Sequence, residues 1–225
     1  MSAGPKLAVN EHAPSRVRSG LIVGYGSIGE RHLKNLRTIV PGIELTVVMQ
    51  RPSVSSERVS LTADLEQALA SKPSFAVIAS PSYLHADQLL ALLGAGVPCY
   101  IEKPVAVTLD QVRRLRAALE LPAPPPITFA GCNLRFMPSL IKMKALLAQG
   151  AIGTPVRAHL QPWQWLPDWR PMREYTSGYS ADAARGGGVM LDLIHEIDQA
   201  RWLLGEFNQI AAVAAKASAL AIDAE

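Results

Sequence analysis

Three glycines near the N-terminus constrain the fold of this chain more than any other feature. Gly24, Gly26 and Gly29 have the spacing G-x-G-x-x-G, directly after the apolar run 21–23 and directly before a helix-like segment at 28–40. This order predicts a strand, a tight turn and a helix. In such a turn the first glycine permits the bend, the second lets the backbone approach a pyrophosphate, and the third allows the helix to pack closely on the strand. We expect a dinucleotide at the start of the helix, although the motif alone also occurs as an ordinary turn in other α/β proteins.

Apolar strand-like runs alternate with helix-like segments over the first two thirds of the chain. We expect strands at 44–49, 75–79, 97–101 and 127–132, and helices at 28–40, 61–70, 85–93, 108–119 and 139–149. Such alternation is typical of a doubly wound parallel sheet, the Rossmann architecture of the α/β class. We therefore expect a flexible tail at 1–15 and a Rossmann dinucleotide-binding domain at 16–153.

The pattern changes after Gly153. We expect a strand at 155–161, a long aromatic and arginine-bearing segment at 162–188, a helix at 189–204 and one further strand at 210–220. Long irregular segments of this kind are usually binding loops, and their aromatic content argues against disorder. Residues 154–225 are thus predicted to form a second unit, distinct from the Rossmann domain, with a helix and strands of a second sheet.

Composition and charge exclude several classes of protein. The 22 lysines and arginines against 19 acidic residues give a net charge of +3, too small and dispersed for a nucleic-acid partner. No run reaches the roughly 20 apolar residues of a membrane helix, so we expect a soluble, cytoplasmic protein. The two cysteines, Cys99 and Cys132, lie in apolar runs without metal-ligand spacing. We expect buried thiols in a reducing compartment and no metal site.

The end of the second predicted strand bears on the choice of cofactor. An acidic residue about 20 positions beyond the glycines would bind the adenosine ribose 2′-hydroxyl. Here the strand is followed by Gln50, Arg51, Pro52 and Ser53. A carboxylate would repel a 2′-phosphate, whereas Arg51 can bind one. The sequence favours NADP over NAD, and the alternative is an ordinary exposed arginine.

Three residues have side chains suited to acid–base chemistry. Lys103 follows the strand at 97–101, at the edge of the sheet where ligands of open α/β sheets bind. Asp192 and His195 are three residues apart after three consecutive glycines, a spacing that places both on one helix face. Taken alone, such a lysine is commonly a solvated strand end and such a histidine a structural residue.

Five stretches occur in a characteristic order, namely GYGSIGERH, ASPSYLHA, YIEKP, NLRF and GGGVMLDLIHEID. Together they resemble the glucose-fructose oxidoreductase, inositol dehydrogenase and MocA (Gfo/Idh/MocA) family, over about residues 21–205. The resemblance implies an NAD(P)-dependent oxidoreductase that transfers hydride between a nicotinamide and a secondary hydroxyl or keto group of a sugar, sugar acid or nucleotide sugar. Two alternatives remain open: a non-catalytic cofactor or ligand sensor of the same fold, and a relative that uses NAD in glycoside cleavage.

The resemblance also assigns roles to residues. It implies that Lys103 and His195 face the reacting hydroxyl, that Asp192 assists them, and that Asn133 and Arg135 line the same cleft. Proposed cofactor-binding residues are Gly24, Gly26, Ser27, Ile28, Gly29, Arg51, Ser80, Pro81, His85, Glu102 and Lys103. The residue types themselves suggest further substrate contacts, because aromatic rings offer flat faces to sugars and arginines bind phosphate or carboxylate. The residues chosen on this ground are Trp169, Arg170 and Tyr179.

The chain departs from the family pattern in two respects. Asp192 and His195 are three residues apart, whereas many members separate them by four; both spacings keep the pair on one face. The chain ends at Glu225, after about two strands of the sheet that completes the family's second domain. The resemblance implies that residues 154–225 are a partial α+β domain for substrate binding and oligomerisation, with a mainly antiparallel sheet, in a shortened form whose activity is in question. It implies a homo-oligomer for a full-length form and leaves the state of this chain open.

Overall fold

The computed structural model describes residues 17–49, 59–120, 124–162 and 164–224. The strands are β1 (Ser19–Val23), β2 (Glu44–Val48), β3 (Val59–Thr62), β4 (Ala76–Ile78), β5 (Cys99–Ile101) and β6 (Thr128–Ala130). The helices are α1 (Ser27–Ile39), α2 (Leu65–Ala70), α3 (His85–Gly94), α4 (Leu109–Leu119), α5 (Pro138–Ala148), α6 (Val189–Asp192) and α7 (Ile194–Leu204). The predicted tail at 1–15 and Arg51 lie outside the described residues.

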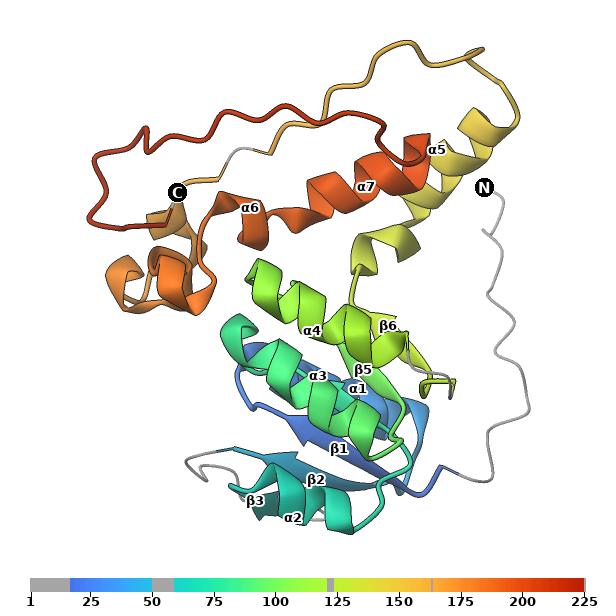
Figure 1. Cartoon of the computed structure of the whole chain (residues 1–225), viewed down its shortest axis with the longest axis vertical. Helices are drawn as coiled ribbons and strands as arrows, with labels where there is room; N and C mark the ends of the chain where they lie inside the picture. The colour runs from blue at the N-terminus through green and yellow to red at the C-terminus, as the bar shows by residue number, and fades with distance from the viewer. Residues whose placement is uncertain (1–16, 50–58, 121–123, 163, 225) are drawn as a thin grey trace, which may run out of the picture.

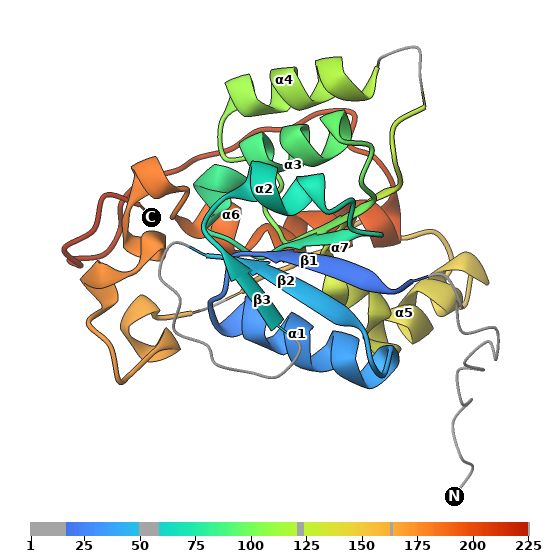
Figure 2. The same cartoon turned by 90° about the horizontal axis from the view of Figure 1, so that it is seen from below.

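One parallel sheet of six strands organises the N-terminal half (Figure 1). Its order is β3-β2-β1-β4-β5-β6, and every neighbouring pair is parallel. The chain thus winds outward from β1 in one direction and then in the other. Helix α1 covers one face of the sheet, and α2, α3 and α4 cover the other (Figure 2). The predicted doubly wound Rossmann sheet is confirmed.

The central strand explains why the first apolar run is continuous rather than alternating. Leu21 and Val23 pack in the core beneath α3, against residues such as Leu89. Ile22 points to the opposite face and packs with Leu33 of α1. All three residues of the run are at most 1% exposed. Because helices cover both faces, a polar residue at any of these positions would be buried without a partner.

The predicted helix at 61–70 is wrong in its first half. Residues Val59–Thr62 instead form β3, which pairs in parallel with β2. Helix α2 begins only at Leu65, where the Asp64 carboxylate caps it by accepting hydrogen bonds from the backbone N–H groups of Glu66 and Gln67. The free edge of β2 offered a ladder of backbone hydrogen bonds, and this tertiary pairing outweighed the local helical pattern.

The strands predicted at 155–161 and 210–220 do not form, and the structure describes no strand after Ala130. Helix α7 does pack against α5, and Lys144 Nζ donates to the backbone oxygen of Trp202 at 2.7 Å. A strand is stable only where a neighbour pairs with its N–H and C=O groups. The two segments do not pair with one another: Val156 is 98% exposed and Val213 is fully exposed. In the described part of the chain no helix is long and apolar enough to cross a membrane.

Candidate functional site

The glycine turn between β1 and α1 has the geometry of a nucleotide-binding turn. Gly24 has φ +93°, and a Cβ there would lie 2.4 Å from Ser80 Cα. A Cβ on Gly29 would lie 2.2 Å from the backbone oxygen of Gly24, so α1 approaches the turn too closely for any side chain. A Cβ on Gly26 would meet no atom within 4 Å. The second glycine therefore borders open space beside the start of α1, where backbone N–H groups have no side-chain cap.

His85, at the start of α3, joins the loops that follow β4 and β5. Its side chain is 1% exposed, with Nδ1 2.7 Å from the backbone oxygen of Pro104 and Nε2 2.8 Å from that of Ser80. Burial lowers the pKa of His85. Both ring nitrogens face backbone oxygens, so the imidazole has no polar atom left for a ligand. The prediction that His85 contacts the cofactor directly does not fit this geometry; the imidazole instead fixes the loop that carries Lys103.

Like His85, Glu102 has a side chain that is held by hydrogen bonds, in this case from the side of the sheet that α1 covers. Its Oε1 lies 2.7 Å from Nε2 of His32 in α1. The side chain of Tyr100 also hydrogen-bonds to Glu102, and burial is the main reason why the pKa of Tyr100 is raised to about 12. The carboxylate thus ties α1 to the end of β5. His32 was not among the predicted site residues, although it lies within the first matching stretch, GYGSIGERH.

Lys103 and Asp192, 89 positions apart in sequence, meet through the backbone. Lys103 Nζ donates a hydrogen bond to the backbone oxygen of Asp192 at 2.7 Å. The predicted continuous helix at 189–204 is wrong, because Leu193 (φ −101°, ψ 29°) separates α6 from α7. The N–H of Glu196, which would bond to the Asp192 oxygen in an unbroken helix, bonds to Leu193 instead. The break leaves the Asp192 oxygen free for the ammonium group.

The carboxylate of Asp192 has other partners than its backbone oxygen. The residue is 6% exposed, and the side chains of Tyr179 and Ser180 hydrogen-bond to the carboxylate. Burial raises the pKa of Asp192, while these hydrogen bonds and the charges of Lys103 and Arg170 oppose the rise. The assisting role predicted for Asp192 would have its carboxylate hold Lys103 and His195. The structure contradicts that for Lys103, which contacts the backbone of Asp192 and not its side chain.

His195 lies in the first turn of α7, beside Lys103. Burial lowers the pKa of His195, and the positive charge of Lys103 lowers it further. Nδ1 is buried without a hydrogen-bond partner among the described residues. An imidazole with a lowered pKa is neutral at physiological pH and can accept a proton there. The lysine and the histidine therefore supply a cation and a base in one place.

The N-x-R-F turn packs against α7. Arg135 Nε donates to Asp198 Oδ2 at 2.9 Å, and a second guanidinium nitrogen donates to Oδ1. These contacts lower the pKa of Asp198. Because the guanidinium forms a two-point pair with Asp198, Arg135 holds the turn against α7, whereas Asn133 is exposed. Cys99 is buried as predicted, but Cys132 is only half-buried.

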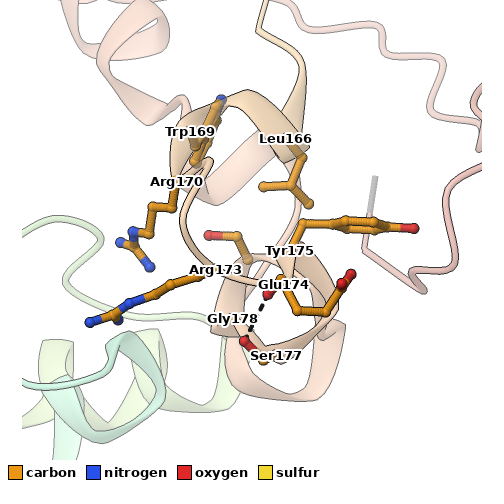
Figure 3. A pocket seen from close by; sticks show the side chains of 9 residues that line it. Leu166, Trp169, Arg170, Arg173, Glu174, Tyr175, Ser177 and Gly178 are labelled. Carbon is orange, nitrogen blue, oxygen red and sulfur yellow. Dashed lines mark hydrogen bonds between the residues drawn. The ribbon is translucent and has the colours of Figure 1, made fainter.

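A hollow opens in the aromatic and arginine-bearing segment (Figure 3). Its lining residues are Leu166, Trp169, Arg170, Arg173, Glu174, Tyr175, Ser177, Gly178 and Ser180. Two of the predicted substrate residues, Trp169 and Arg170, belong to it. The third, Tyr179, hydrogen-bonds to Asp192 instead. Ser180 was not among the predicted site residues. It lines the hollow, and its side chain hydrogen-bonds to Asp192.

Comparison with known protein families gives two matches along the chain. Residues 19–121 match a family described as "Oxidoreductase family, NAD-binding Rossmann fold", and residues 140–224 match the "GFO/IDH/MocA C-terminal domain". The chain belongs to the Gfo/Idh/MocA family. The stretches that carried the resemblance therefore identified the family correctly.

Individual relatives and solved structures agree with this membership. Inositol 2-dehydrogenase of Acidothermus cellulolyticus is 32% identical over 214 residues, which cover 91% of this chain and 59% of that protein. The fold is similar to scyllo-inositol dehydrogenase of Lactobacillus casei with NAD(H) and scyllo-inositol (24% identity, TM-score 0.65, 84% of this chain and 57% of that one). It is also similar to the WlbA dehydrogenase of Chromobacterium violaceum with NADH and UDP-GlcNAcA (21% identity, TM-score 0.66, 85% of this chain and 56% of that one). The chain spans between half and six tenths of the length of these proteins.

Proposed function

We propose that this chain carries the cofactor site and the acid–base residues of an NAD(P)-dependent oxidoreductase acting on a secondary hydroxyl or keto group of a sugar or cyclic polyol. The observation that carries the proposal is the hydrogen bond from Lys103, just after β5, to the backbone oxygen of Asp192, with His195 within electrostatic reach of the ammonium group. Relatives named as inositol 2-dehydrogenases support the reaction class. In domain terms, we propose the division at about residue 153, which the two family matches at 19–121 and 140–224 support.

The residues at the glycine turn fit a dinucleotide. The open space beside Gly26 admits a pyrophosphate, and the uncapped N–H groups at the start of α1 can bind its oxygens. Ser27 and Ile28 form the first turn of that helix. Ser80 and Pro81 follow β4 at the same edge of the sheet. When bound there, a nicotinamide supplies the hydride acceptor or donor.

His195 and Lys103 share the remaining chemistry. Oxidation of a secondary alcohol requires a base for the hydroxyl proton while hydride leaves the same carbon. The neutral imidazole of His195 accepts that proton. The ammonium of Lys103, fixed by the Asp192 oxygen, stabilises the negative charge that develops on the alcohol oxygen. In the reverse direction the same ammonium polarises a carbonyl group.

We further propose a preference for NADP over NAD. The support is in the sequence, because the residues directly after β2 include Gln50 and Arg51 where a carboxylate would be expected in an NAD-specific protein. The family description and the NADH-bound relative refer to NAD. If Arg51 binds a 2′-phosphate, Arg51→Ala weakens NADPH binding about tenfold and leaves NADH binding within about twofold. Equal losses for both cofactors contradict the preference.

A binding measurement followed by a substrate screen tests the function. NADH and NADPH are titrated into the full chain and followed by their fluorescence, and absence of binding refutes the proposal at its first step. Cofactor-loaded protein is then screened with cyclic polyols, sugars, sugar acids and nucleotide sugars for reduction of the nicotinamide. A version extended to the full length of the relatives is screened in parallel. If both bind cofactor and neither reduces it with any alcohol, the oxidoreductase assignment fails.

A further inference from the structure

The hollow in Figure 3 is lined by two arginines that form no ion pair within the described residues. Arg170 and Arg173 line it, and neither guanidinium has a hydrogen-bond or ion-pair partner in the part of the chain that the structure describes. Both extend to the same side of the loop, while the carboxylate of Glu174 points to the opposite side (Figure 3). Two unneutralised cations on one wall repel each other, and an anion between them relieves that repulsion.

The hollow adjoins the proposed reaction centre. Ser180 forms part of its wall, and the side chain of Ser180 hydrogen-bonds to the carboxylate of Asp192. Burial raises the pKa of both Asp192 and Tyr179, and the charge of Arg170 opposes the rise, so this arginine lies within electrostatic reach of the cluster. A molecule whose hydroxyl group lies beside Lys103 can therefore place another of its groups in the hollow.

Size and chemistry define that group. The hollow has a volume of about 80 Å³, several times the roughly 10–15 Å³ needed for one water molecule. This is room for a single small group rather than for a nucleoside or a second sugar ring. Guanidinium groups bind phosphate and carboxylate through two parallel hydrogen bonds.

We propose that Arg170 and Arg173 form a subsite for a phosphate or carboxylate group of the substrate, so that this chain acts on an acidic sugar or polyol derivative rather than a neutral one. The inference rests on the proposed function, because it treats the neighbouring cluster as the place where the alcohol reacts. It goes further by naming the second recognition element and the charge of the substrate.

Titration with small anions tests the subsite without requiring turnover. Inorganic phosphate and, separately, acetate are added to the full chain at constant ionic strength set with chloride, and the arginine Nε–H signals are followed by NMR. We expect saturable shifts of Arg170 and Arg173 and none of Arg113, an exposed arginine of α4. Saturation by phosphate alone indicates a phosphate ester, and saturation by acetate alone indicates a carboxylate. Shifts that rise linearly for all arginines overturn the proposal.

Substitution of the two arginines gives a second test of the subsite. In Arg170→Gln/Arg173→Gln the dissociation constant of the favoured anion rises at least about tenfold, whereas Arg113→Gln leaves it unchanged. Both arginines are exposed, so the melting temperature of the double variant stays near that of the parent chain. Anion affinity that survives the double substitution overturns the subsite. If nicotinamide binds but the anions do not, the subsite fails alone; if the anions bind but nicotinamide does not, the proposed function fails.

Discussion

The ammonium group of Lys103 donates a hydrogen bond of 2.7 Å to the backbone oxygen of Asp192, across 89 residues of sequence. That oxygen is available because the helix is interrupted at Leu193. The lysine is thus fixed by main chain, and the carboxylate of Asp192 remains with Tyr179 and Ser180. A side chain positioned by backbone tolerates few replacements, since only a long cation can reach the same oxygen.

Replacement of Lys103 tests its role in catalysis. We expect Lys103→Met to lower kcat by about 100-fold or more, the usual cost of losing one group that stabilises developing negative charge. The measurement is the rate of nicotinamide reduction with a substrate from the screen. Lys142→Met, on the exposed side of α5, is the matched control and should retain full activity. A Lys103→Met enzyme with normal kcat would exclude the assigned role.

The same substitution should change the titration of His195. Burial and the charge of Lys103 both lower the pKa of His195. Removal of the ammonium leaves burial opposed by the charges of Glu196, Asp198 and Glu102, so the pKa moves up toward its ordinary value near 6.5. NMR titration of the His195 ring protons in the parent chain and in Lys103→Met measures the shift, and Lys142→Met controls for loss of charge elsewhere. A downward shift, or none, is inconsistent with the two side chains acting together.

There is a physical reason why some elements of this fold could be predicted from the sequence and others could not. The apolar run at 21–23 and the three glycines report constraints that are local, and both were interpreted correctly. The break at Leu193 was missed because the apolar periodicity continues through it, and the contact that uses the released oxygen comes from β5. The strands expected at 155–161 and 210–220 do not form. A strand also needs a pairing partner, which the sequence of the segment itself does not specify.

His85 is expected to support both stability and the position of Lys103. At pH 8, His85→Gln should lose about 1–3 kcal/mol of unfolding free energy, because the buried hydrogen bond that the neutral imidazole donates to one of the two facing backbone oxygens is lost. The exposed His159→Gln is the control. Urea unfolding of both variants and the parent chain measures the difference.

The pH dependence of stability provides an independent check on His85. Its folded-state pKa lies below the unfolded value of about 6.5. The neutral imidazole therefore contributes stability that is fully present above pH 6.5 and is lost as the pH falls through the folded-state pKa. Between pH 8 and pH 5 the parent chain and His159→Gln should lose more stability than His85→Gln. Equal losses in all three would show that His85 does not titrate with folding.

Two glycines of the same turn should respond in opposite ways to alanine. Gly29→Ala places a Cβ 2.2 Å from the backbone oxygen of Gly24, so α1 must move and the melting temperature should fall by several degrees. Gly26→Ala meets no atom within 4 Å at a negative φ of −93°, so the folded chain should keep its melting temperature. The methyl group would nevertheless occupy the space proposed for the pyrophosphate, and NADH and NADPH affinity should fall at least about tenfold. Normal cofactor binding by a stable Gly26→Ala chain would place the dinucleotide elsewhere.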